Sequence, residues 1–231
     1  MLKQFFKMLS KQDLLTQGLN DTHEMGAVSL KQYNHVIDLV FNSKTDVTHD
    51  QIEEVRKQDY LINHFERSIR KKVFEHIAIN DKEEQQLYTA FVLITIVNNL
   101  ERIGDYSKNI SEIAESKKML KDEEWNKKME KYSLDTQYLF INTLKAFKNG
   151  DEELASRVID RHFEIKKSID ADLIDIVSIE PPLNVNYASY ALLLRYLKRI
   201  CSHLMNISTS VTNPIDKIGY YVGDEEIKDD E

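Results

Sequence analysis

Apolar residues recur every three or four positions along most of this chain, which is the spacing of one face of an α-helix. A largely apolar face in the first part consists of Leu15, Leu19, Thr22, Tyr33, Val36 and Val40. A second stripe consists of Ile52, Val55, Ile62, Ile69 and Val73. Continued along the chain, the pattern predicts six helices, at about 11–41, 50–79, 82–118, 122–149, 151–179 and 183–212.

Capping and breaking residues support these boundaries. Two polar pairs are the expected N-terminal caps of the second and third helices, Thr48 or Asp50 and Asn80 or Asp81. Asn149-Gly150 is expected to end the fourth helix. Pro181-Pro182 forces a turn after the fifth, and the sixth stops before Asn213-Pro214.

The fold class is predicted to be all-α. The 231 residues include six Gly and three Pro, and no Pro precedes Pro181, so helix breakers are scarce over most of the length. Six helices suggest two tandem three-helix bundles. We expect the first at 1–120 and the second at 121–221, followed by a disordered acidic tail at 222–231.

Charge and composition narrow the class of protein. A net charge of −8 and the lack of a basic stripe argue against nucleic acid as a partner. The single cysteine, Cys201, excludes an intramolecular disulfide and fits a reducing compartment. The longest apolar run, at 90–97, is too short to span a membrane. We therefore expect a cytoplasmic protein.

The first eleven residues, MLKQFFKMLSK, form a short amphipathic segment. They lack the uninterrupted apolar stretch and the small-residue cleavage site of a signal peptide. We expect this segment to pack on its own domain, and contact with a membrane surface or a partner is the alternative.

The most informative stretch is NNLERIGDYSKNISEIAE at 98–115. Its steps of three and four residues place Asn98, Glu101, Asp105 and Asn109 on one helix face. Such a face is costly to bury unless something, most plausibly a hard cation, neutralises the negative charge. The stretch therefore points to an ion site.

Acids on the preceding helix reinforce this interpretation. Asp59 and Glu66 fall within the apolar stripe, with Asn63 beside Asp59. If the turn lies near residues 80–81, residues whose numbers sum to about 160 lie level on antiparallel helices. Asp59 should then face Glu101, with Asp105 within reach of the same site.

We thus predict a metal site with oxygen ligands. The expected ligands are Glu101, Asp105 and Asp59, and the expected supporting residues are Asn98, Asn109, Glu66 and Asn63. Oxygen-only ligation favours Fe, Mn or Mg over Zn. The alternative is a solvated acidic face partly neutralised by Arg102, Lys108 or a lysine of the second helix.

The chain also contains an internal repeat, because residues 98–111 align with 195–208. Six positions are identical, at Leu100/Leu197, Arg102/Arg199, Ile103/Ile200, Asn109/Asn206, Ile110/Ile207 and Ser111/Ser208. The acids are lost in the second copy, where Lys198, Cys201 and Ser202 replace Glu101, Gly104 and Asp105. His162 and His203 remain there as possible ligands, but a structural role is favoured for each. Metal chemistry should therefore be confined to the first bundle.

With both copies in view, the chain resembles the PhoU family, whose repeats carry a segment much like LERIGDxxxNIAE. The resemblance implies two three-helix bundles side by side, with acidic motifs that hold iron or other metal ions. It assigns the acidic positions of the motif to Glu101 and Asp105 and the acid of the preceding helix to Asp59. The chain departs from the family where Gln86-Leu87-Tyr88 replaces a DLR-like segment, and in the loss of the second motif.

The resemblance also implies a negative regulator of phosphate uptake. The expected partners are a phosphate transporter, of the ABC type or the sodium/phosphate type, and a sensor histidine kinase. Membrane association would be peripheral and through such a partner, and association into a homo-oligomer is left open.

The rival from another class is an oxygen-activating di-iron enzyme. Such bundles carry Glu-x-x-His on two helices, whereas the one comparable spacing here, Asp46-x-x-His49, falls in an expected loop. No nucleophile turn or Walker loop is present in the sequence either. A regulatory binding protein without catalytic residues is therefore favoured over an enzyme.

Overall fold

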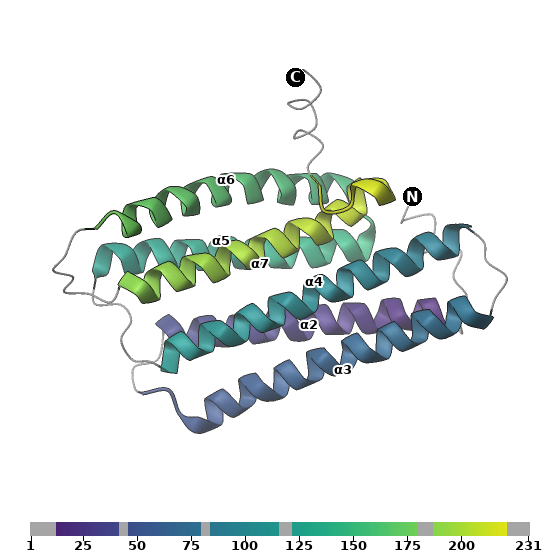
Figure 1. Ribbon diagram of the computed structural model, residues 1–231, viewed down its shortest axis with the longest axis horizontal. Helices are drawn as coiled ribbons and strands as arrows, with labels where there is room; N and C mark the ends of the chain where they lie inside the picture. The colour runs from purple at the N-terminus through teal and green to yellow at the C-terminus, as the bar shows by residue number, and fades with distance from the viewer. Residues whose placement is uncertain (1–12, 42–45, 80–83, 116–121, 180–186, 221–231) are drawn as a thin grey trace, which may run out of the picture.

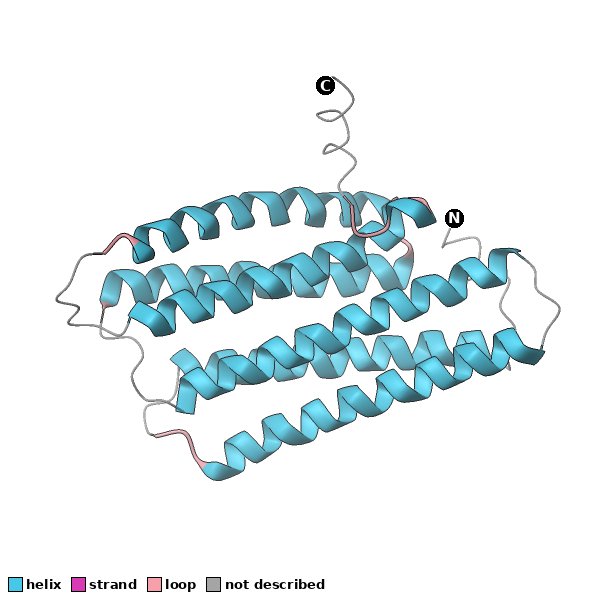
Figure 2. Ribbon diagram, viewed as in Figure 1, coloured by secondary structure: helices cyan, strands magenta, loops and turns pink. Residues whose placement is uncertain are grey.

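The computed structural model describes residues 13–41, 46–79, 84–115, 122–179 and 187–220. The regular secondary structure within these ranges is helical, and short loops connect the helices (Figure 2). The helices are α2 (Leu14–Phe41), α3 (His49–Ile79), α4 (Glu84–Glu115), α5 (Glu123–Asn149), α6 (Glu152–Val177), α7 (Tyr187–Thr212) and the short 3-10 helix η1 (Ile215–Lys217). The six expected α-helices are confirmed, with ends that differ from expectation by about four residues or fewer.

Local hydrogen bonds explain several helix ends. Thr48 precedes α3, where its hydroxyl accepts from the Gln51 amide while the Gln51 side chain accepts from the Thr48 amide, so the two form a capping box. The Asp122 and Asp151 carboxylates cap α5 and α6. Gly150 ends α5 with φ 58°, a left-handed conformation that glycine adopts without strain.

Other expected features lie outside the described residues. These are the cap at Asn80 or Asp81, the turn at Pro181-Pro182, the first eleven residues and the acidic tail at 222–231.

The helices form two three-helix bundles. Helices α2, α3 and α4 pack together, and so do α5, α6 and α7 (Figure 1). The expected stripe of α3 is buried, with Val55, Ile62 and Ile69 almost inaccessible to solvent. The all-α fold with two bundles is thus confirmed, while the division at residues 120 and 121 stays a prediction.

Helices α4 and α7 join the bundles and run antiparallel, side by side (Figure 1). The Tyr106 and Tyr196 ring centroids are 6.0 Å apart, and His203 Nδ1 lies 2.8 Å from Asn99 Oδ1. In the internal repeat Asn99 corresponds to Tyr196 and Tyr106 to His203, so these two contacts are equivalent. The repeats are therefore related by an approximate two-fold axis that passes between α4 and α7.

Helices α2 and α5 form a second, smaller junction between the bundles. The Tyr33 hydroxyl donates to the Ser133 carbonyl over 2.8 Å. Farther along, a Cβ on Gly26 would lie 2.6 Å from Leu144 Cδ2, so the absence of a side chain permits the close approach. Among the described residues, no helix is long and apolar enough to cross a membrane.

Candidate metal centre on the first bundle

Four carboxylates lie along the seam between α3 and α4. We call them the acidic row, and they are Asp59, Glu66, Glu101 and Asp105. All four are half-buried, with side-chain exposure from 13% at Glu66 to 35% at Asp105. The apolar stripe of α3 therefore does bring its two acids to a partly desolvated seam.

The register of α3 against α4 differs from the expected one. A Cβ on Gly104 would lie 3.1 Å from Ile62 Cδ1, so these two residues lie level. Their numbers sum to 166 rather than about 160, an offset of about six residues or 9 Å along a helix. Asp59 consequently does not face Glu101 directly. Part of the offset arises because α4 begins at Glu84 rather than at about residue 82, and the missing side chain of Gly104 lets Ile62 pack closely at this register.

Lys108 lies between two acids of the row. Its Nζ is 3.0 Å from Asp59 Oδ2 and 3.5 Å from Asp105 Oδ1, so it brings the acid of α3 and the acid of α4 together. Burial by itself would lower the pKa of Lys108, but the hydrogen bond and charge of Asp59, aided by Asp105, outweigh burial and raise it.

The other end of the row is held by Arg70. This guanidinium contacts Glu66 at 2.8 Å and Asn98 Oδ1 at 2.6 Å, so it ties α3 to α4. The alternative predicted from the sequence, neutralisation by nearby cations, is thus seen in part. Arg70 itself was missed, although its position four residues after Glu66 is a recognisable ion-pair spacing.

Glu101 occupies the middle of the row. Burial raises the pKa of its carboxyl, and the negative charges of Asp105 and Glu66 raise it further, while Arg102 opposes the shift. Arg102 lies 3.6 Å from both Glu101 and Asp105. Three acids therefore act on one another electrostatically even though cations surround them.

The predicted supporting residues share this region. Asn98 is bonded to Arg70, and Glu66 belongs to the acidic row. Asn63 and Asn109 are half-buried on α3 and α4. These placements are compatible with the predicted support of a metal site.

The donor atoms of the acidic row suit a hard cation, because all are carboxylate oxygens. As the described side chains lie, no group of three or more His, Cys, Asp or Glu is close enough to hold a metal ion. The Lys108 ammonium stands between Asp59 and Asp105. The residues therefore fit a metal if Lys108 withdraws and the carboxylates turn towards a common point.

The second bundle has a different arrangement at the equivalent place. Lys198, which replaces Glu101, forms an ion pair with Asp170 of α6, a partner that was not predicted from the sequence. Burial lowers the pKa of His162 to about 4, so this ring is neutral in the core. Cys201 is buried beside Thr136, and burial raises the pKa of its thiol to about 12.

Comparisons with known proteins agree with this architecture. The family model described as the PhoU domain matches residues 22–114 and 131–211, one segment in each bundle. A search of curated protein sequences found no match.

Two solved structures share the fold. One is the crystal structure of PhoU from Pseudomonas aeruginosa, with a TM-score of 0.75, 22% identity, and coverage of 86% of this chain and 95% of that one. The other is the phosphate transport system regulatory protein PhoU from Streptococcus pneumoniae, with a TM-score of 0.71, 16% identity, and coverage of 85% and 92%. Because the family model covers both bundles and most of the chain, this protein belongs to the PhoU family.

Proposed function

We propose that this protein regulates phosphate transport through contact with other proteins. The observation that carries the proposal is the match of the PhoU domain to both bundles. A structural neighbour described as a phosphate transport system regulatory protein points the same way. The partners are a phosphate transporter, of the ABC or the sodium/phosphate type, and a sensor histidine kinase, and the protein acts in the cytoplasm.

Deletion of the gene tests this role. We expect the deletion strain to take up more phosphate or to accumulate polyphosphate, because a negative regulator has been removed. A plasmid copy of the wild-type gene should reverse the change. Unaltered phosphate uptake and polyphosphate content would contradict the regulatory role.

Within the same function, the acidic row is a metal site that acts as a structural or sensing element. Glu101, Asp105 and Asp59 are the ligands, and Fe, Mn or Mg is the ion. Asn98, Asn109, Glu66 and Asn63 support the ligands. A bound ion would replace the charge compensation that the Lys108 ammonium supplies, and Lys108 would then release Asp59 and Asp105.

Calorimetric titration with Mn tests the site. The double variant Glu101→Ala/Asp105→Ala should lose stoichiometric binding, because it removes two of three ligands. Asp170→Ala is the matched control, since this acid belongs to the ion pair of the second bundle. If the double variant binds Mn as the parent does, the assignment is wrong.

The regulatory role is favoured over an oxygen-activating enzyme. His49 is the first residue of α3 and Asp46 precedes that helix, so their pair does not lie on a bundle helix as Glu-x-x-His ligands do. Oxygen consumption or peroxide formation by the iron-loaded protein distinguishes the two functions. Sustained turnover that Glu101→Ala abolishes would favour the enzyme.

A further inference from the structure

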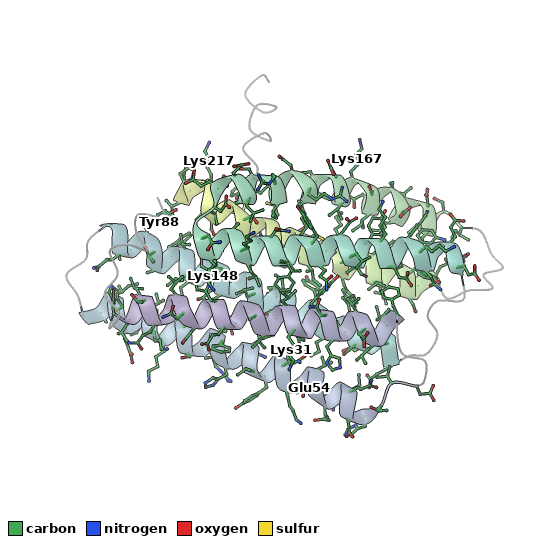
Figure 3. The ribbon with its side chains drawn as sticks, turned by 180° about the vertical axis from the view of Figure 1, so that it is seen from behind. Lys31, Glu54, Tyr88, Lys148, Lys167 and Lys217 are labelled. Carbon is green, nitrogen blue, oxygen red and sulfur yellow. The ribbon has the colours of Figure 1, made fainter. Side chains whose placement is uncertain are left out.

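The outer side of α5 exposes an apolar stripe. Leu134, Tyr138 and Ile141 follow one another at steps of four and three residues, and their exposed fractions are 66%, 49% and 47%. This spacing places them on one helix face. Seen from behind (Figure 3), α5 lies between α2 and α6.

Grooves run along both sides of this stripe. Leu134 lines a groove of about 370 Å³ against α2, together with Ile37 and Phe41. It also lines a groove of about 520 Å³ against α6, where Tyr138 joins it. Two helices pack side by side when the side-chain ridges of one enter the grooves beside the ridges of the other, so an apolar ridge between two grooves suits an amphipathic helix lying along it.

Lysines stand at both ends of the stripe. Lys131 precedes it, and Lys145 and Lys148 follow it, all exposed on α5; Lys148 is labelled in Figure 3. We call these three lysines and the three apolar residues the α5 face. In the α6 groove Arg161 pairs with Asp135 at 2.7 Å and with Glu164 at 2.6 Å, and Arg157 and Asp160 also line this groove. On the α2 side, Asp38 and Glu130 line the other groove.

A second copy of this chain is a poor occupant of the α5 face. Antiparallel pairing of two α5 helices centred on Tyr138 would place Lys131 of one copy beside Lys145 of the other. Like charges at that distance repel each other. The acidic tail at 222–231 is equally unsuitable, because Val222 and Ile227 are its only aliphatic residues and three apolar positions need covering.

We propose that the α5 face binds an amphipathic helix of a partner protein that carries acidic residues at both ends. Its apolar residues, spaced as i, i+4 and i+7, cover Leu134, Tyr138 and Ile141. Its acidic ends meet Lys131 at one end and Lys145 and Lys148 at the other, about 21 Å apart along α5. The α5 face is the place where the regulator proposed above meets a partner protein, so the inference rests on that function.

The probe is a fluorescein-labelled helical peptide with Leu at i, i+4 and i+7 and two Glu at each end, measured by fluorescence anisotropy. A second peptide has Lys in place of each Glu. We expect the Glu peptide to bind the full-length protein at least about tenfold more tightly than the Lys peptide, because of complementary charge. Raising the salt from about 50 to 500 mM should reduce this preference.

Two variants locate the binding on the α5 face. Tyr138→Ser/Ile141→Ser should weaken binding of the Glu peptide about tenfold or more, because anchoring side chains are lost. Lys131→Glu/Lys145→Glu should reverse the preference towards the Lys peptide. Phe74→Ser is the control, since Phe74 is 71% exposed on the first bundle. All substituted residues are exposed, so the helical circular dichroism and melting temperature should stay close to those of the parent.

Several outcomes would overturn the inference. If both peptides bind with equal affinity, or if Lys131→Glu/Lys145→Glu does not reverse the preference, the proposed charge complementarity is wrong. If sedimentation shows a dimer and the Tyr138→Ser/Ile141→Ser variant dissociates it, the occupant of the α5 face is a second copy of this chain. If the protein binds phosphatidylglycerol vesicles but neither peptide, and the same variant abolishes vesicle binding, the α5 face binds a membrane. The gene deletion tests the regulatory role separately, so either proposal can fail while the other holds.

Discussion

At the scale of single residues, the carboxylates of the acidic row are paired with basic side chains. Arg70, Arg102 and Lys108 lie 2.8 to 3.6 Å from the acids of the row. Partly exposed pairs of this kind stabilise a fold by a fraction of a kcal/mol each, so stability alone does not explain the placement of four acids along one seam. Among the cations that contact the row, Lys108 is the one that pairs with acids of both helices, and the proposed metal site requires it to withdraw.

Replacing Lys108 tests this requirement. Lys108→Met should tighten binding of Mn about tenfold, because the ion no longer displaces an ammonium and meets one more uncompensated negative charge. The same change should lower the free energy of unfolding of the metal-free protein by about 0.5–1 kcal/mol, because Asp59 loses its partner. Calorimetric titration and urea unfolding measure the two effects.

Lys72→Met provides the comparison, because Lys72 pairs with Asp21 of α2 rather than with the acidic row. It should leave the affinity for Mn unchanged. If Lys108→Met weakens binding or both variants behave alike, Lys108 does not restrict access.

At the scale of elements, the short link between α5 and α6 combines a helix stop and a helix start. Gly150 ends α5 in the left-handed region, and its amide donates to the Phe147 carbonyl over 3.3 Å. Asp151 follows at once and accepts from the Leu154 amide at 3.0 Å. The stop at Gly150 was predicted from the sequence, whereas the cap at Asp151 was not, although caps and stops both depend on neighbouring residues only.

Gly150→Ala measures the contribution of the stop. The substitution should lower the free energy of unfolding by about 1 kcal/mol, because a Cβ is disfavoured at φ 58°. Urea unfolding followed by circular dichroism measures it. Lys145→Ala, at an exposed interior position of α5, should change stability by less than about 0.5 kcal/mol. An equal loss in both variants would show that the backbone conformation is not the cause.

At the scale of the whole molecule, the α4–α7 contact joins the two bundles and half-buries His203. Burial lowers the pKa of His203 to about 4, with smaller effects from the positive charges of Arg199 and Arg102. Its ring also stacks on Tyr106, with centroids 5.8 Å apart. The junction therefore favours neutral His203.

This predicts a dependence of stability on pH. The folded pKa, about 4, lies below the unfolded value of 6.5, so between these values the unfolded chain binds a proton that the folded chain does not. The stability that neutral His203 contributes to the folded state is complete above pH 6.5 and is lost as the pH falls towards 4. His203→Gln, which keeps a donor for Asn99, should reduce the loss of unfolding free energy between pH 7 and pH 5 by about 2 kcal/mol.

Urea unfolding at pH 7, 6 and 5 checks this expectation. His64→Gln, at an exposed position of α3, is the control and should alter the pH dependence less. Identical pH profiles for His203→Gln and the parent would mean that this histidine does not contribute.

The amino-acid sequence by itself determined the six helices, their buried faces, the internal repeat and the family, because helical periodicity, caps and motifs are local properties of the chain. It also placed four acids on facing sides of α3 and α4. Only the tertiary structure decided the register, which brings Gly104 level with Ile62 and differs by about six residues from the expected one. That register puts Lys108 between Asp59 and Asp105, and such placement depends on packing between helices, which no pattern within one helix encodes.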